Sequence, residues 1–101
     1  MVTRIELAPD VAEDFERILE HLATHQVEQP ERRIGEIIGA LDVLESNPLI
    51  GRPAANGMRK LVIGRRSHGY LALYRYLAEI DAVIVLAVRN RREAGYVERS
   101  K

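Results

Sequence analysis

The sequence predicts a single α+β domain over residues 1–101, with elements in the order β-α-α-β-β-β and a helical hairpin packed on an antiparallel sheet. Hydrophobic residues repeat about every 3.6 positions in the first half of the chain and every two positions after residue 57, so the helices precede most of the strands. The last three predicted strands are joined by short connections, which favours hairpins. A length of 101 residues is typical of one hydrophobic core.

The N-terminal segment is predicted to form a short strand followed by a helix. Apolar and polar residues alternate over residues 2–7, as in a strand with one buried face. Pro9 is tolerated in the first turn of a helix, and the carboxylates after it complement the positive end of the helix dipole. Apolar residues then recur every three or four positions, with charges on the opposite face. We expect this amphipathic helix to end near residues 24–26.

A second helix is predicted to open at Pro30 and to end at residues 46–47, before Pro48. Its apolar stripe comprises Ile34, Ile37, Ile38, Leu41 and Leu44. Gly35 and Gly39 each lower helix propensity by roughly 1 kcal/mol relative to alanine. We expect these two glycines to permit close approach to the first helix in an αα-hairpin.

The C-terminal half is predicted to form a three-stranded antiparallel meander. Residues 47–57 contain Asn-Pro, Gly-Arg-Pro and Asn-Gly, which mark a loop with several fixed turns. Strands are predicted over residues 58–63, 69–77 and 82–89, where the hydrophobic period is two. The last of them is apolar on both faces, which predicts a central position in the sheet.

The composition excludes several classes of site and favours a cytoplasmic location. The chain has no cysteine, so it has no disulfides, thiolate metal sites or cysteine nucleophiles, as suits a reducing compartment. Its longest apolar run, residues 82–88, has the length of a strand and not of a membrane span. Its N-terminus is charged and interrupted by Pro9, unlike a secretory signal. We expect no cofactor and no membrane association.

Charge is distributed unevenly although the net charge is zero. Residues 1–50 carry 4 bases and 11 acids, whereas residues 51–101 carry 11 bases and 4 acids. Such asymmetry favours an anionic partner for the basic half, either a nucleic acid or an acidic protein. Alternatively, the two halves neutralise each other across the fold.

The histidines offer weak candidates for chemistry. His21 and His25 are four residues apart on one helix face, but a metal site needs further ligands and none is near in the sequence, so we interpret them as solvated. His68 falls in a predicted hairpin loop, where it is either a general acid or base or simply exposed. We predict no metal site.

Basic residues are the better candidates. Arg59 and Lys60 point to opposite faces of a predicted strand, so at most one of them faces the helices. Arg75 lies in mid-strand, where burial without a partner is costly, so it either reaches a sheet edge or meets a carboxylate. The residues predicted to bind a target or a partner protein are Arg52, Arg59, Arg65, Arg66, Arg75, Arg89 and Arg92.

The end of the last predicted strand gathers guanidinium groups near Tyr96. Guanidinium groups can stabilise the negative charge that develops when a phosphodiester is cleaved without a metal, while a polar group handles the 2′-hydroxyl proton. The same group of side chains would equally serve as a docking patch for an acidic helix.

Several short motifs, in this order and spacing, resemble the RelE/ParE superfamily of toxin–antitoxin toxins over nearly the whole chain. These motifs are Asn47-Pro48, Gly51-Arg52-Pro53, Met58-Arg59-Lys60-Leu61, residues 69–76 and residues 83–93. The resemblance implies a toxin of a type II toxin–antitoxin, or plasmid stabilisation, module. It also implies a cognate antitoxin, acidic or amphipathic, that wraps the toxin surface and through which alone the toxin meets operator DNA.

RelE-like members of the superfamily cut messenger RNA in the ribosome. By position, Arg91 corresponds to their arginine after the last strand, Tyr96 approximately to a nearby tyrosine and Lys60 to a basic residue on the second strand, so these three would be the catalytic residues under a RelE-like function. Two departures weaken the match. Leu71 stands where these proteins commonly have an arginine, and Arg91 and Tyr96 are closer in the sequence than in RelE-like sites.

ParE-like members lack the nuclease set and inhibit DNA gyrase. They have a long helical hairpin, a Gly-Arg in the following loop and a Tyr-Arg in the third strand, which Gly51-Arg52 and Tyr74-Arg75 match. The leucine at position 71 therefore favours the ParE-like function, with mRNA cleavage as the alternative. A third interpretation is an inactive member that only binds its antitoxin. In each case we expect acidic antitoxin side chains to cover the basic half beside the sheet.

Overall fold

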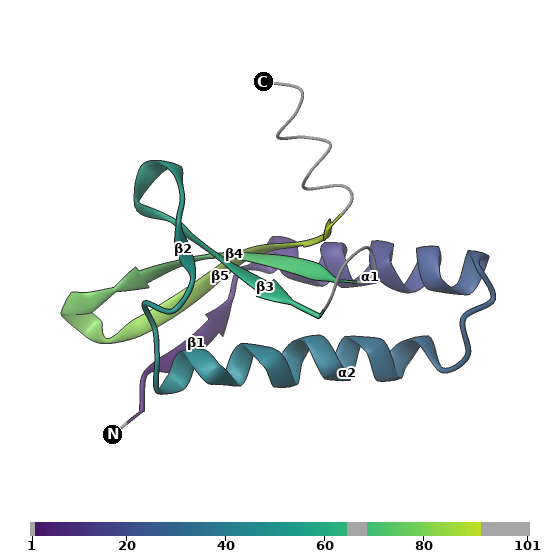
Figure 1. The fold of residues 1–101 in the computed structure, drawn as a ribbon, viewed down its shortest axis with the longest axis horizontal. Helices are drawn as coiled ribbons and strands as arrows, with labels where there is room; N and C mark the ends of the chain where they lie inside the picture. The colour runs from purple at the N-terminus through teal and green to yellow at the C-terminus, as the bar shows by residue number, and fades with distance from the viewer. Residues whose placement is uncertain (1, 65–68, 92–101) are drawn as a thin grey trace.

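The computed structural model describes residues 2–64 and 69–91. Two helices lie against one sheet, as Figure 1 shows. The helices and strands are β1 (Arg4–Leu7), α1 (Pro9–Thr24), α2 (Pro30–Leu41), the 3-10 turn η1 (Asp42–Glu45), β2 (Arg52–Pro53), the 3-10 turn η2 (Ala55–Gly57), β3 (Arg59–Ile63), β4 (Tyr70–Leu77), the 3-10 turn η4 (Ala78–Ile80) and β5 (Ala82–Asn90). The predicted α+β class and element order are confirmed, with β2 as an additional strand.

The sheet has five strands in the order β1-β5-β4-β3-β2. Strands β3, β4 and β5 form the predicted antiparallel meander, and β5 lies in the interior of the sheet between β1 and β4. The sheet as a whole is mixed and not purely antiparallel, because β1 pairs with β5 in parallel. A parallel pair needs a long connection, and here all the intervening elements supply it.

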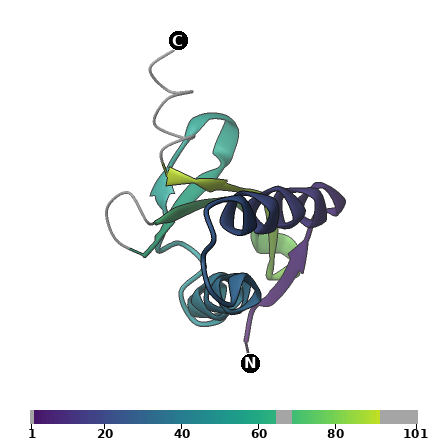
Figure 2. The same ribbon diagram turned by 90° about the vertical axis from the view of Figure 1, so that its right-hand side faces the viewer.

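Both helices pack on the same face of the sheet. They run side by side in opposite directions, and Figures 1 and 2 show them from two sides. Their apolar stripes and one face of the strands form a single core, which comprises Val11, Ile18, Leu22, Ile37, Leu41, Leu44, Ile63, Tyr70, Ala72, Tyr74, Val83, Val85 and Val88. This arrangement leaves the other face of the sheet without a helix from the described part of the chain.

The helical hairpin is confirmed, but two details of α2 differ from expectation. The helix ends at Leu41, five residues before the predicted end at residues 46–47, and the chain continues as the 3-10 turn η1. A β-carbon added at Gly35 or Gly39 would meet nothing within 4 Å. The two glycines therefore face open space and do not permit closer approach to α1. Within residues 2–64 and 69–91, no helix is long and apolar enough to cross a membrane.

The turn between β4 and β5 is tied to the N-terminus through Asp81. Its carboxylate accepts hydrogen bonds from the Thr3 hydroxyl at 2.7 Å and from the Tyr76 hydroxyl at 2.8 Å. These bonds hold the pKa of Asp81 below its ordinary value of 3.8, and the bond from Thr3 has the larger effect. The bond to Asp81 in turn raises the pKa of Tyr76 above its ordinary value of 10.0.

We expect stability to depend on pH through this cluster. Since folding lowers the pKa of Asp81, its contribution is present above the unfolded-state pKa and is lost as the pH falls through the folded-state pKa. Since folding raises the pKa of Tyr76, its contribution is present below pH 10.0 and is lost as the pH rises through the folded-state pKa. Thr3→Val should raise the pKa of Asp81, measured by NMR titration of its carboxyl carbon. Thr24→Val, at the far end of α1, is the control, and an unchanged Asp81 titration in Thr3→Val would refute the assignment.

Candidate functional site

The face of the sheet that α1 and α2 leave uncovered is the candidate site, and we call it the open face. Residues directly opposite each other on paired strands share a face. Lys60 pairs with both Arg52 and Leu73, and Leu71 pairs with both Val62 and Arg89. The open face therefore carries Arg52, Lys60, Val62, Leu71, Leu73, Arg75, Ile84, Ala87 and Arg89.

The open face has an apolar centre between cationic side chains. Val62 is 41% exposed, and Leu71 and Leu73 beside it are half-buried although no described helix covers them. Lys60 and Arg89 flank this centre on the neighbouring strands β3 and β5. An apolar centre within a polar rim is the arrangement of protein–protein interfaces.

Arg75 is half-buried on the open face, two residues after Leu73 along β4. A β-carbon added at Gly57 would lie 3.5 Å from the Arg75 Nη1 atom, so this guanidinium reaches the turn η2. Within residues 2–64 and 69–91 it forms no salt bridge with a carboxylate, so the predicted carboxylate partner is not found among these residues.

Arg52 is exposed on the edge strand β2, and a buried tyrosine fixes the loop that precedes it. The Tyr74 hydroxyl donates to the Pro48 carbonyl at 2.7 Å and accepts from the Gly51 amide at 2.9 Å. The tyrosine is 0% exposed, so its ring holds this loop against the core. The two residue pairs that carried the ParE-like prediction, Gly51-Arg52 and Tyr74-Arg75, are thus joined by one hydrogen bond.

Arg59 faces the helix side of the sheet, because it pairs with the buried Tyr74. Its Nη1 atom donates to the Leu49 carbonyl at 3.1 Å and to the Gly51 carbonyl at 2.8 Å. Arg59 and Lys60 thus lie on opposite faces, as the strand alternation predicts. The guanidinium of Arg59 is engaged by the loop, whereas Lys60 lies on the open face.

Arg89 reaches from the open face to a buried carboxylate on α1. Asp14 is 5% exposed, and its Oδ1 atom accepts from Nη1 of Arg89 at 2.5 Å and from Nη1 of Arg17 at 3.2 Å. The other oxygen, Oδ2, accepts from the Val88 amide at 2.9 Å. Because β1 pairs with β5 only up to Val85, this amide lies on an edge of β5 that no described strand covers, and Asp14 supplies its acceptor. The sequence-based site did not include Asp14.

Arg91 follows directly after β5 and is exposed, and its amide donates to the Gly69 carbonyl at 3.0 Å. This bond extends the β4–β5 pairing by one residue and fixes where the chain leaves the sheet. The remaining predicted site residues lie outside the described residues; they are Arg65, Arg66, Arg92 and Tyr96, together with His68.

The histidines on α1 form a local contact. The rings of His21 and His25 are 4.2 Å apart, and Nδ1 of His25 lies 2.9 Å from the His21 carbonyl oxygen. Among the residues that the structure describes, no group of three or more histidine, aspartate or glutamate side chains is placed to hold a metal ion.

Comparison with known proteins gives one family and one fold. The family model described as the ParE toxin of type II toxin–antitoxin systems, parDE, matches residues 5–95. The fold is similar to a structure of the chromosomal ParDE system from P. aeruginosa, with a TM-score of 0.71 and 20% identity over 87% of this chain and 95% of that chain. A comparison with curated proteins finds no match.

Two further structures share the fold. The RelBE2 toxin–antitoxin complex from Mycobacterium tuberculosis gives a TM-score of 0.64 and 22% identity over 90% of this chain and 100% of that chain. A mutant of the E. coli toxin RelE in the free state gives 0.63 and 15% over 97% of this chain and 93% of that chain. At these identities the likenesses show the fold alone.

Proposed function

The chain belongs to the family of ParE toxins of type II toxin–antitoxin systems, and from this membership we propose that it inhibits DNA gyrase by binding it through the open face. A cognate antitoxin neutralises the toxin by covering the same face. Both encounters take place in the cytoplasm, where gyrase works, and neither requires a cofactor.

The observation that carries this proposal is the apolar centre of the open face. Val62, Leu71 and Leu73 occupy the middle of the face, where a nuclease would need cations that converge on a phosphate. Burying these three side chains against a partner protein removes apolar surface from water, and the flanking cations orient the partner. This division of roles suits a protein target better than an RNA backbone.

Messenger RNA cleavage is the second candidate function, because Lys60 and Arg89 share the open face and Arg91 follows at its edge. As a nuclease, the toxin would use these cations to stabilise the developing negative charge at the scissile phosphate. This function requires a general acid and base as well as cations. Cleavage thus relies on charged and polar groups, whereas gyrase binding relies on the apolar centre, so a substitution at the apolar centre should affect the two functions differently.

The test of the proposal is gyrase supercoiling by the purified enzyme, with toxin added, and mapping of messenger RNA ends in cells that express the toxin. We expect inhibition of supercoiling and intact messenger RNA. Leu71→Glu should weaken inhibition at least about 30-fold, as loss of a central interface residue does. Lys60→Glu should act mainly on the association rate and its salt dependence.

The matched control is Arg32→Glu, which makes the same charge change as Lys60→Glu at an exposed position on α2, away from the open face. Circular dichroism melting of each variant separates loss of folding from loss of binding. New messenger RNA ends with unaffected supercoiling would reject gyrase as the target and establish cleavage. Equal effects of Arg32→Glu and Leu71→Glu would reject the open face as the contact surface.

A further inference from the structure

The fold itself already uses two of the arginines that were predicted to bind a partner. The guanidinium of Arg89 is held by the carboxylate of Asp14, and that of Arg59 donates to two loop carbonyls. By contrast, Arg52 and Arg75 form no salt bridge with a carboxylate among the described residues. Their charges are therefore not neutralised by an acid within this part of the fold.

Arg52 and Arg75 lie together with Lys60 at one end of the open face. Arg52 pairs with Lys60 across β2 and β3, and Lys60 pairs with Leu73, two residues before Arg75 on β4. On one face of antiparallel strands, the β-carbons of opposite residues are about 5 Å apart and those of diagonal neighbours roughly 7–8 Å. The long side chains of all three residues can thus reach one ligand. We call Arg52, Lys60 and Arg75 the cation cluster.

The backbone beneath the cation cluster is held in place by hydrogen bonds. Gly51, directly before Arg52, donates from its amide to the Tyr74 hydroxyl at 2.9 Å, and its carbonyl accepts from Nη1 of Arg59 at 2.8 Å. Lys60 lies within strand β3, between β2 and β4. Cations on a backbone that is already fixed lose less conformational freedom when a ligand binds, which favours binding.

The ligand of this cluster needs negative charge at one end and apolar groups at the other. Val62 lies two residues after Lys60 on β3, and Leu71 lies two residues before Leu73 on β4, so the face beside the cluster is apolar. A nucleic acid repeats its charge along the whole backbone, whereas a protein segment can separate acidic from apolar residues. We propose that the cation cluster binds carboxylates of an acidic protein segment whose apolar residues cover the apolar centre. On the proposed function, on which this choice of partner rests, the segment belongs to gyrase.

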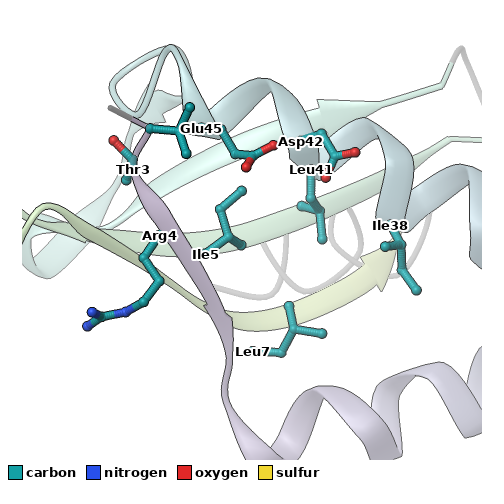
Figure 3. Close-up of a pocket in the computed structure, with 9 residues that line it drawn as sticks. Thr3, Arg4, Ile5, Leu7, Ile38, Leu41, Asp42 and Glu45 are labelled. Atoms are coloured by element: carbon teal, nitrogen blue, oxygen red, sulfur yellow. The ribbon is translucent and has the colours of Figure 1, made fainter.

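The opposite edge of the sheet does not suit such a segment. A groove of about 510 Å³ lies beside β1, the edge strand farthest from β2. Figure 3 shows Asp42 and Glu45 along this groove and Arg4 pointing away from it. Acidic side chains of a partner would be repelled by these two carboxylates. Charge complementarity therefore directs the acidic end of the segment to the β2 edge.

The test is the binding of a fluorescent peptide, with leucines at one end and glutamates at the other, to the full chain by fluorescence anisotropy. Replacing the glutamates of the peptide by glutamines should weaken binding about fivefold or more. Arg52→Gln, Lys60→Gln and Arg75→Gln should each weaken binding of the glutamate peptide about fivefold and lower its salt dependence. Arg32→Gln makes the same charge change at an exposed position on α2 and should leave the affinity unchanged.

The double variant Lys60→Gln/Arg75→Gln distinguishes one site from independent charges. It should lose less affinity than the product of the two single losses, because the two cations share a ligand. A loss equal to the full product would overturn the proposal, as would an equal loss in Arg32→Gln. Tighter binding of a single-stranded oligoribonucleotide through the same three residues would also overturn it and make nucleic acid the ligand. Circular dichroism of each variant verifies that the fold is retained.

Gyrase supercoiling with the same variants separates this proposal from the proposed function. We expect the three substitutions in the cation cluster to weaken inhibition about as much as they weaken peptide binding. Peptide binding that depends on the cluster, without inhibition of gyrase by the parent chain, would reject gyrase as the partner and support the carboxylate site. Inhibition that is unaffected by all three substitutions would overturn the cluster as part of the gyrase contact.

Discussion

Asp14→Ala is expected to destabilise the domain by about 3 kcal/mol, a large part of the 5–15 kcal/mol that holds an ordinary domain folded. The substitution leaves the Val88 amide without its acceptor on a buried edge of β5. It also removes the carboxylate that pairs with Arg89 and Arg17. Both arginines are more than two-fifths exposed, so water compensates part of their loss and the estimate stays at the lower end of the range for buried pairs.

Urea unfolding measures this loss of stability, and two further variants separate the hydrogen bond from the charge and provide a control. Asp14→Asn keeps an oxygen that can accept from the Val88 amide but loses the charge, so it should cost about half as much. Asp10→Ala removes an exposed acid from the same helix and should cost less than about 0.5 kcal/mol. If Asp14→Ala and Asp10→Ala were equally mild, Asp14 would not support β5.

Gly51→Ala is expected to destabilise the domain by about 3 kcal/mol, at the upper end for overpacking. A β-carbon there would lie 2.7 Å from Cε1 of Tyr74 and 2.8 Å from both the Tyr74 hydroxyl oxygen and the Lys60 carbonyl oxygen. Neither the buried ring nor the strand backbone can move easily. The loop would have to break its hydrogen bonds to Tyr74 and Arg59, and Arg52 would then be displaced.

The control is the same substitution at Gly39, where an added β-carbon meets nothing within 4 Å. Gly39→Ala should stabilise the domain by about 1 kcal/mol through helix propensity, so one chemical change is expected to act with opposite signs at two sites. Thermal and urea unfolding of both variants check this. A Gly51→Ala variant as stable as the parent would show that Tyr74 does not hold the loop rigidly.

Periodicity predicted the elements well because burial of one side of a helix or strand produces a regular spacing of apolar residues in the sequence. It also placed Arg59 and Lys60 on opposite faces, as observed. Asp14 was missed although its spacing could have identified it, because it lies three residues after Val11 and four before Ile18, on the buried stripe of α1. An acid at such a position predicts a buried partner, and the missing information was which amide or cation would meet it.

Other features of the fold could not be predicted from the local sequence pattern. Alternation in residues 2–7 shows which face of the strand is buried but not which strand is its neighbour, so the parallel pairing of β1 with β5 could not be predicted from it. Strand β2 has two residues, too few for any period. The spacing of Gly35 and Gly39 places them on one side of α2 but does not say which side faces α1.

The position of β5 between β1 and β4 also determines when the protein can acquire its shape during synthesis. β5 follows all the other described strands in the chain, so a ribosome makes it after them. Until then β1 has no neighbour to pair with, and the core lacks Val83, Val85 and Val88. The native contacts are long-range and form late, which delays folding. The nascent chain therefore has no completed open face, and under the proposed function it cannot bind gyrase until most of the chain has been translated.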